Sequence, residues 1–433
     1  MNKLTLWLQK QPQWFLALYA GLAAFATYSC MFAFRKPFTA ADFATVDSIK
    51  VNYKVWLVAA QVLGYMFSKF YGIRVIAEMK SMSRMRSIIL LIATAWLALL
   101  LFAIAPVYLK PVCMFINGFP LGMIWGLVFS YVEGRRTTEM MGSILASSFV
   151  FASGFAKTIG KWLMNDMHVS QFWMPFFAGG IFLIPMLLFV QMLNAIPLPT
   201  AADIASRTVR QPMNRDERKA FVQQFLPGLF FLVLAYILIT ALRDLRDNFM
   251  NEIWAGLGQP ANAATFTQTE LPATLIVLAA TASLIIVKRN RLAFMLTHGM
   301  VLAGLLITLI STWAFTTQHI SPYWWLLLTG VGLYISYIPV NCIFFERMLA
   351  TYGIAANVGF VMYIADAFGY LGTLSALFLK EFSGLRLPWV SFYIQTLFVC
   401  ATISLILIGL SAIYFNQKRS TLTVNVPNIL ATA

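Results

Sequence analysis

The sequence predicts an all-α polytopic membrane protein with about twelve transmembrane helices in two pseudo-symmetric six-helix halves. Of its 433 residues, 60% are hydrophobic and 11% are charged, and the mean hydropathy is +0.76. A soluble domain is typically about 45–50% apolar and about 25% charged. One bilayer crossing takes about 20 residues, so the apolar sequence suffices for roughly a dozen crossings. This composition excludes a soluble enzyme, a disulfide scaffold and a disordered chain.

Uncharged stretches mark the expected spans. The first, Trp14–Phe34, is longer than the hydrophobic core of a signal peptide, which has about 7–15 residues, so we expect it to remain as the first helix. The stretch Leu292–Phe345 is too long for one helix and divides near Gln318–Pro322. The other expected spans are Val55–Arg74, Ser87–Leu109, Pro111–Val132, Met140–Lys161, one within Val169–Ala202, Ala220–Leu242, Leu271–Val287, Met348–Lys380 and Leu387–Gln417. The alternating segments of a barrel are absent, which indicates helices.

The distribution of lysine and arginine places both termini in the cytoplasm. With the N-terminus inside, the tails and the even-numbered loops carry most of the basic residues, including the runs MKSMSRMR and VKRNR. The opposite loops hold only Lys50, Lys54, Lys110, Lys380 and Arg386. This asymmetry follows the positive-inside rule and accounts for the net charge of +15 without a nucleic-acid partner. We expect an integral protein of a bacterial inner (plasma) membrane.

The longest charged interruption, RTVRQPMNRDERK, lies near the middle of the chain. Six helices, a basic linker and six more helices form the layout of a pseudo-symmetric transporter. We therefore predict an N-terminal six-helix bundle (1–195), a cytoplasmic linker (196–222), a C-terminal six-helix bundle (223–417) and a cytoplasmic tail (418–433). The chain is expected to act as a monomer within the lipid bilayer.

No pattern in the sequence indicates an enzyme, a metal site or a cofactor. The cysteines, Cys30, Cys113, Cys342 and Cys400, lie inside apolar runs, without a CxxC pair or a nearby histidine. We interpret them as small buried hydrophobic residues. The sequence has three histidines and neither an HExxH nor a GxSxG motif, so it offers no catalytic residues.

Basic residues within the expected spans are the main functional signal. An ionisable side chain near the bilayer centre costs between about 2.5 and 17 kcal/mol, so it persists where it faces a wet cavity, has a partner or has a function. Arg35 either marks the outer end of the first span or has such a function. Lys69 is flanked by apolar residues on both sides. Lys157 and Lys161 share one helix face, and in the simplest interpretation Lys161 is interfacial while Lys157 alone is buried.

The densest charged cluster, RDLRDN, begins at Arg243 in the first helix of the second half. Arg243 and Asp247 are four residues apart and could neutralise each other in a structural ion-pair network. The excess of basic over acidic residues among the buried candidates instead favours an anionic ligand, which arginine binds in a bidentate manner. The pseudo-twofold repeat would place Arg35 and Arg243 on opposite sides of one cavity. The candidate substrate-binding residues are Arg35, Lys69, Lys157, Arg243 and Arg246.

Acidic residues in the spans are candidates for proton coupling or gating. Burial raises the pKa of a membrane carboxyl group toward neutrality, as a proton carrier requires. Asp366 has no cation near it in the sequence, whereas Glu346 either has this function or pairs with Arg347 or a cytoplasmic loop. Asp244 and Asp247 complete this set of candidates.

Four segments, taken together, resemble a known family. They are YSCMFAFRKPF, LGYMFSKF, ITALRDLRDNF and ADAFGYLG, in the expected first, second, seventh and eleventh helices. In this order they resemble the major facilitator superfamily and, within it, the organophosphate:phosphate antiporter branch. The resemblance implies the major facilitator fold and makes Arg35 and Arg243 the phosphate-binding pair, with Lys69 assisting. It also implies that the first helix continues through Phe38 toward Phe43, which would place Arg35 deeper.

The sequence departs from that branch at several positions. The histidine of the branch's fifth helix is replaced by Ala152 or Ser153, with Lys157 one turn later, and Glu346 stands where the tenth helix has another polar residue. The superfamily's GxxxDRxGRR motif is also missing after the second helix. The resemblance is therefore that of a distant relative, and it does not identify the substrate.

The leading hypothesis is a secondary transporter that moves a small phosphorylated or carboxylated anion by alternating access, through anion exchange. An anion bridging Arg35 and Arg243 would neutralise both and let the halves move. The alternative is a proton-coupled transporter of a larger or amphipathic compound that uses Asp366 and Glu346. A nutrient sensor descended from a transporter is a further alternative.

Overall fold

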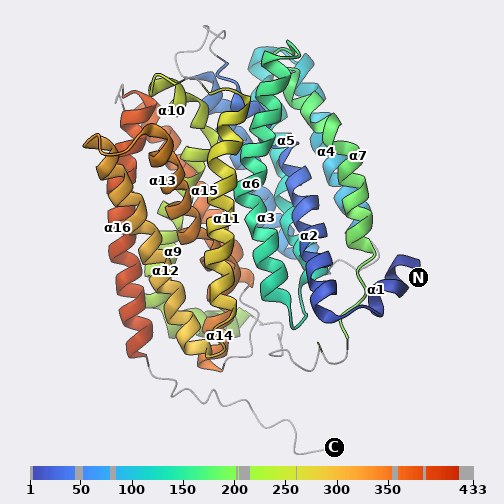
Figure 1. Cartoon of the computed structure of the whole chain (residues 1–433), viewed down its shortest axis with the longest axis vertical. Helices are drawn as coiled ribbons and strands as arrows, with labels where there is room; N and C mark the ends of the chain where they lie inside the picture. Colours follow the sequence, from blue (N-terminus) through green and yellow to red (C-terminus); the bar gives the residue numbers. More distant parts are fainter. Residues whose placement is uncertain are drawn as a thin grey trace, which may run out of the picture.

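The computed structural model is helical throughout the part of the chain that it describes (Figure 1). Its helices form two adjacent groups, one built by the first half of the sequence and one by the second. The described residues are 3–43, 52–78, 84–200, 203, 215–259, 261–353, 359–383 and 387–418. Residues 201–202 and 204–214 of the predicted linker, most of the predicted tail and the loop 79–83 therefore lie outside the described residues.

The first half begins with the short helix α1 and continues with six long helices. Several helices have a proline in the first turn. The N–H groups of that turn have no partner within the helix, so proline, which lacks an N–H group, costs no hydrogen bond there. Pro111 and Pro175 occupy such positions. The elements are α1 (Lys3–Gln9), α2 (Gln13–Phe32), the 3₁₀ turn η1 (Pro37–Ala40), α3 (Tyr53–Glu78), α4 (Arg84–Ile104), the 3₁₀ turn η3 (Val107–Leu109), α5 (Lys110–Val132), α6 (Thr138–Asn165) and α7 (Met174–Asn194).

The second half repeats this arrangement. A capping box begins α11, where Asn262 and Thr265 exchange backbone and side-chain hydrogen bonds, and Gly353 ends α14 with a φ of 66°. The elements are α9 (Arg215–Asn248), α10 (Met250–Gly256), α11 (Ala263–Ile285), α12 (Asn290–Thr316), α13 (Pro322–Pro339), the π-helical turn η4 (Val340–Phe344), α14 (Phe345–Tyr352), α15 (Gly359–Phe382) and α16 (Trp389–Gln417).

The lengths and compositions of these helices agree with the predicted spans. Among the described residues, 9 helical segments are long and apolar enough to cross a membrane. Helices α3, α11 and α15 are outside that set, but their 26, 23 and 24 residues are long enough for a crossing. Large apolar side chains such as Leu90, Ile184 and Ile310 are exposed on the outer surface, as expected for helices that face lipid. The chain is thus a polytopic membrane protein.

Two glycines permit the closest helix contact of the first half. Helices α3 and α5 approach each other so tightly that a Cβ at Gly64 would overlap the backbone carbonyl of Phe115. A Cβ at Gly118 would overlap the carbonyl of Gln61 in the same way. Small residues at membrane helix contacts permit this approach.

Gly118→Ala is expected to lower the melting temperature of the detergent-purified protein. The added methyl group would meet backbone atoms, and such overpacking costs about 1–3 kcal/mol. Gly299→Ala is the matched control, because Gly299 lies inside α12 with open space around it. Alanine is favoured over glycine in a helix by about 0.5–1 kcal/mol, so this control should melt at the parental temperature or above. Equal melting temperatures for the two variants would contradict the packing argument.

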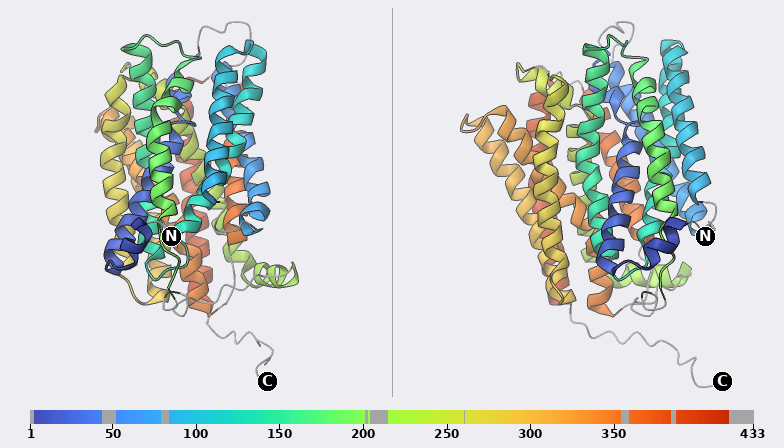
Figure 2. Two further views of the ribbon diagram at one scale, coloured as in Figure 1. Left: turned by 90° about the vertical axis from the view of Figure 1, so that its right-hand side faces the viewer. Right: turned by 45° about the vertical axis from the view of Figure 1, so that its right-hand side comes forward.

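The two halves meet along two helix pairs, α6 with α11 and α3 with α15. The view turned by 45° shows the halves side by side, and in the view turned by 90° the first half lies in front of the second (Figure 2). One end of the bundle carries α10, and we call it the α10 end. The other end carries α14 and the C-terminus of α16, and we call it the α14 end (Figure 1).

Two local expectations have clear outcomes. The division of Leu292–Phe345 near Gln318–Pro322 is confirmed, since α12 ends at Thr316 and α13 begins at Pro322. The continuation of the first helix toward Phe43 is wrong, because α2 ends at Phe32 and the chain passes through turns into η1. Pro37 is consistent with this break, because proline has no N–H group to donate within a continuing helix.

Candidate functional site

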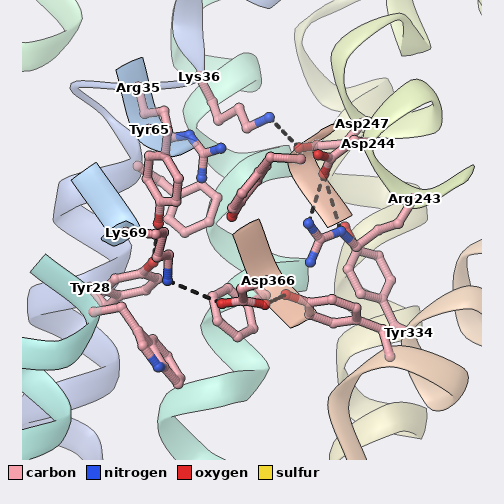
Figure 3. A pocket seen from close by; sticks show the side chains of 15 residues that line it. Tyr28, Arg35, Lys36, Tyr65, Lys69, Arg243, Asp244, Asp247, Tyr334 and Asp366 are labelled. Atoms are coloured by element: carbon pink, nitrogen blue, oxygen red, sulfur yellow. Dashed lines mark hydrogen bonds and ion pairs between the residues drawn. The ribbon is translucent and has the colours of Figure 1, made fainter. Parts of the chain in front are cut away.

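A cavity lies between the two halves (Figure 3). Its lining consists entirely of charged and aromatic side chains, contributed by both halves. The lining residues are Tyr28, Phe32, Arg35, Lys36, Tyr65, Lys69, Trp125, Phe149, Arg243, Asp244, Asp247, Tyr334, Tyr337, Asp366 and Tyr370.

Arg35 enters the cavity from the turn that follows α2. Its guanidinium carbon lies 4.0 Å from the centre of the Tyr65 ring, a cation–π contact. The end of α2 leaves carbonyl groups without helical partners, and side-chain amides bind them. Gln61 donates to the carbonyl of Arg35 at 3.1 Å, and Asn117 donates to that of Phe34 at 3.0 Å. These bonds fix the turn that presents Arg35 to the cavity.

No carboxylate pairs with Arg35 among the described residues. Its side chain is nevertheless buried, with 7% exposure, and its Nε atom has no hydrogen-bond partner in the described part of the chain. A buried charge of this kind is costly unless a partner compensates it. The guanidinium is therefore available to an anion in the cavity.

Arg243 faces the cavity from α9, on the side opposite Arg35 (Figure 3). Its guanidinium carbon lies 3.8 Å from the centre of the Tyr337 ring, so each arginine stacks on a tyrosine of its own half. Unlike Arg35, Arg243 has an internal counter-ion, because its Nη2 atom lies 2.7 Å from Asp244 Oδ1. Thr373 donates to the other oxygen of Asp244 at 3.0 Å. The expected pairing of Arg243 with Asp247 is wrong.

Asp247 instead binds two lysines from the other half. Lys36 Nζ lies 2.5 Å from Asp247 Oδ2, and Lys157 Nζ lies 2.7 Å from Asp247 Oδ1. Ser153 also donates a hydrogen bond to Oδ1, and Lys36 donates to Asn248 at 2.7 Å. Lys157 is buried and Lys161 is only partly so, as the simplest interpretation of that pair predicts.

Asp366 forms a second contact between the halves. Its Oδ2 atom lies 3.1 Å from Lys69 Nζ, which comes from α3 (Figure 3). Its Oδ1 atom accepts hydrogen bonds from Tyr236 at 2.5 Å and from Asn341 at 3.3 Å. Asn341 lies in the π-helical turn η4 that follows Pro339. Asp366 is thus fixed within its own half and has a cation partner that is distant in sequence.

Positive charge exceeds negative charge at this site. Arg35, Lys36, Lys69 and Arg243 line the cavity together with the carboxylates of Asp244, Asp247 and Asp366. Lys157 lies directly behind the lining, on Asp247. Five cations therefore face three carboxylates among the described residues, which leaves two positive charges to be balanced. In a medium of low dielectric constant, this excess favours an anionic ligand.

Besides Lys157, two predicted site residues do not line the cavity. Arg246 is buried in the second half, where Nη1 lies 2.7 Å from Glu270 Oε1 and Nη2 donates to the carbonyl of Leu326 at 2.9 Å. Glu346 lies in α14 and is partly buried. Its sequence neighbour Arg347 pairs with Glu139 of α6 at 2.7 Å.

Sequence reasoning did not include the tyrosines of this cavity among its candidates. Tyr65 precedes Lys69 by one helical turn on α3, whereas Tyr28 lies on α2 and Arg35 lies in the turn that follows α2. A tyrosine on the same helix face as a buried cation is a signal that identifies part of this set. Tyr337 and Tyr370 have no such neighbour in sequence, and only the fold brings them to the cavity.

Comparison with known proteins places the chain in a family. Residues 37–418 match the model of a family of unknown function, DUF5690. The chain belongs to the DUF5690 family. The search of curated proteins gives no match to this DUF5690 chain.

The fold of the DUF5690 chain is similar to that in a crystal structure of a D-xylose-proton symporter. The TM-score is 0.61 at 14% sequence identity, and the alignment covers 94% of this chain and 98% of the symporter chain. That symporter has the major facilitator fold, so the fold expected from the sequence is confirmed. At this identity the similarity concerns the fold alone, and the antiporter branch remains a prediction.

Proposed function

We propose that the DUF5690 chain is a secondary transporter that moves a small organic anion, phosphorylated or carboxylated, by alternating access and anion exchange. The observation that carries the proposal is the buried guanidinium of Arg35, which has no carboxylate partner in the described part of the chain. Arg243 faces it across a cavity between two halves that share the major facilitator fold. The substrate anion would bind Arg35 and Arg243 together, with Lys69 beside them.

The charge balance supports exchange. Without ligand, two positive charges in the cavity lack a counter-charge, so rearrangement of the halves around the site would carry uncompensated charge through a low-dielectric region. A bound dianion removes this excess. The return step then requires another anion, which is the defining property of an exchanger.

The lining also supports an anion over a neutral sugar. It contains no Ser, Thr, Asn or Gln side chain among the described residues that surround the cavity. Its three carboxylates are already paired with lysine or arginine. A polyhydroxylated neutral solute would meet few uncommitted hydrogen-bonding groups other than tyrosine hydroxyls, whereas an anion meets arginine and lysine.

The proposal is tested by uptake into proteoliposomes of the full chain. A panel of phosphorylated and carboxylated solutes is offered, with neutral sugars as the comparison. We expect uptake of an anion that requires a counter-anion inside and is indifferent to a proton uncoupler. Arg35→Ala and Arg243→Ala should abolish it, whereas Arg84→Ala, which removes a partly buried arginine away from the cavity, should not. Parental rates in both cavity variants would refute the anion site.

The second candidate is proton-coupled transport of a larger or amphipathic compound. The observation that favours it is the position of Asp366, which lines the cavity and bridges the halves through Lys69. Proton coupling predicts that an uncoupler stops accumulation and that Asp366→Asn does the same. Exchange driven only by a counter-anion predicts that the uncoupler has no effect.

A further inference from the structure

A buried ion pair joins the two halves at the α10 end, away from the cavity lining. Lys54, in the first turn of α3, donates to Glu252 Oε1 at 2.6 Å and to Oε2 at 2.8 Å. It also donates to the carbonyl of Thr39 at 2.6 Å. Lys54 and Thr39 belong to the first half, and Glu252 belongs to α10 of the second. We call Lys54 and Glu252 the α10-end latch.

The latch is separate from the substrate site. Lys54 precedes the cavity residue Tyr65 by eleven positions on α3, which corresponds to about 16 Å along the helix axis. On the opposite half, α10 begins after the break at Phe249 that ends the cavity helix α9. The latch therefore holds the halves together between the cavity and the α10 end of the bundle.

The two ends of the bundle are closed differently. At the α14 end, Arg347 pairs with Glu139, whose side chain retains 25% exposure. In the latch, the Lys54 side chain has 0% exposure and that of Glu252 has 11%. Separating a charged pair from such a buried position is easier after one partner has been neutralised, because an isolated buried charge is costly.

We propose that Glu252 is a proton-sensitive latch, and that protonation of its carboxyl group releases Lys54 and allows the α10 end to open. This inference rests on the proposed alternating-access function, which it extends to regulation. A neutral carboxyl group no longer attracts the ammonium group, and Lys54 is then free to move toward water as the halves separate. Acid on the α10 side would therefore favour the state that is open to that side.

The surroundings of Glu252 support this direction. Burial raises the pKa of Glu252, and the Asp42 carboxylate adds to this effect, whereas the Lys54 ammonium opposes it. Lys161 of α6 also interacts with Glu252. Helix α16, which also packs against α10, has no charged residue. The raised pKa places protonation at a higher pH than for an ordinary glutamate.

The test measures the separation of the halves at the α10 end and does not depend on any substrate. The full chain, with its four native cysteines replaced, receives spin labels at Met167→Cys and Gln259→Cys. Met167 follows α6 and Gln259 follows α10, and both are exposed. Pulsed EPR then gives the distance distribution in nanodiscs at about pH 7.5 and about pH 5.5. An ordinary glutamate, with a pKa of about 4.3, stays largely ionised at both.

In the parental protein we expect acid to raise the population of the open state, which has the longer distance between the labels, about tenfold. A change of this size corresponds to the loss of one charge-assisted pair. Glu252→Gln should be open to the same extent at both pH values, and Lys54→Gln should show the same loss of pH response. One control should keep the parental response. Glu381→Gln alters the carboxylate that accepts from the Asn52 backbone at this same end.

A parental pH response in Glu252→Gln, or loss of the response in Glu381→Gln alone, would overturn the proposal. Melting temperatures of the purified variants confirm that each compared protein is folded. Because the EPR distance needs no transported solute, a failed uptake panel with a normal pH response would reject the anion substrate and keep the latch. Normal anion uptake, together with a distance in the parental protein that does not change with pH, would reject the latch and keep the anion substrate.

Discussion

Arg35→Met is expected to abolish transport while leaving the protein at least as stable as the parent. Arg35 is buried and has no carboxylate partner among the described residues, so its charge costs free energy in the absence of substrate. Methionine has a similar length and packs against the same aromatic neighbours. Replacing buried charges by apolar residues is often neutral or stabilising by about 1–4 kcal/mol. The loss of a charge-assisted hydrogen bond of about 1.5–3 kcal/mol weakens anion binding about 10- to 150-fold.

The measurements are the exchange rate in proteoliposomes and the melting temperature in detergent. Arg243→Met is the matched comparison, because Arg243 also stacks on a tyrosine but has Asp244 as its partner. Its removal leaves a buried carboxylate without a cation, so both transport and stability should fall. If Arg35→Met destabilised the protein as much as Arg243→Met, Arg35 would have a structural partner and the anion site would lose its main support.

Asp247→Ala is expected to cause the largest loss of stability of any substitution in the cavity. Two lysines from the first half, Lys36 and Lys157, converge on this carboxylate, and both are almost fully buried. Removing the carboxylate leaves two like charges close together without a counter-ion. Breaking a buried ion pair by deleting one partner costs about 3–5 kcal/mol. The melting temperature of the purified protein should fall markedly.

A double variant separates charge from packing. Asp247→Ala with Lys157→Met removes one uncompensated lysine, while Lys36 keeps its hydrogen bond to Asn248. The double variant should therefore melt above the single variant, although below the parent. If the double variant melted no higher than Asp247→Ala alone, lost packing rather than unbalanced charge would explain the instability.

The spans and the pseudo-repeat were predictable from sequence because they depend on local composition. A run of apolar residues of the right length becomes a membrane helix wherever it packs, so α12 and α13 separate at the polar segment that the sequence shows. The repeat also predicted that Arg35 and Arg243 face one cavity, and they do. Their binding role remains a prediction.

The partners of the buried charges were not predictable in the same way. Sequence spacing pairs Arg243 with Asp247, but the nearer Asp244 takes the arginine and the lysines of the other half take Asp247. Asp366 shows no cation near it in the sequence, yet Lys69 reaches it from α3. Such pairs depend on how the two halves pack together, and no local spacing rule describes that contact.

The position of Arg35 was only partly predictable from the sequence. Hydropathy left open whether Arg35 marks the end of the first span or functions inside the protein, and an extended first helix would have placed it deeper. The chain instead ends α2 at Phe32, and Gln61 and Asn117 bind the carbonyl groups of the turn. Those amides lie on α3 and α5, so the depth of Arg35 depends on helices that are distant in sequence.

The π-helical turn η4 gives α14 a way to rotate. A π turn holds one more residue than an α turn, so conversion of this π turn to an α turn would rotate the segment beyond it by about 100°. Asn341, which binds Asp366, lies in this turn, and Arg347, which binds Glu139, lies beyond it. One change of helical register would thus move both contacts at once, and the geometry of a single helix would transmit the state of the cavity to the α14 end.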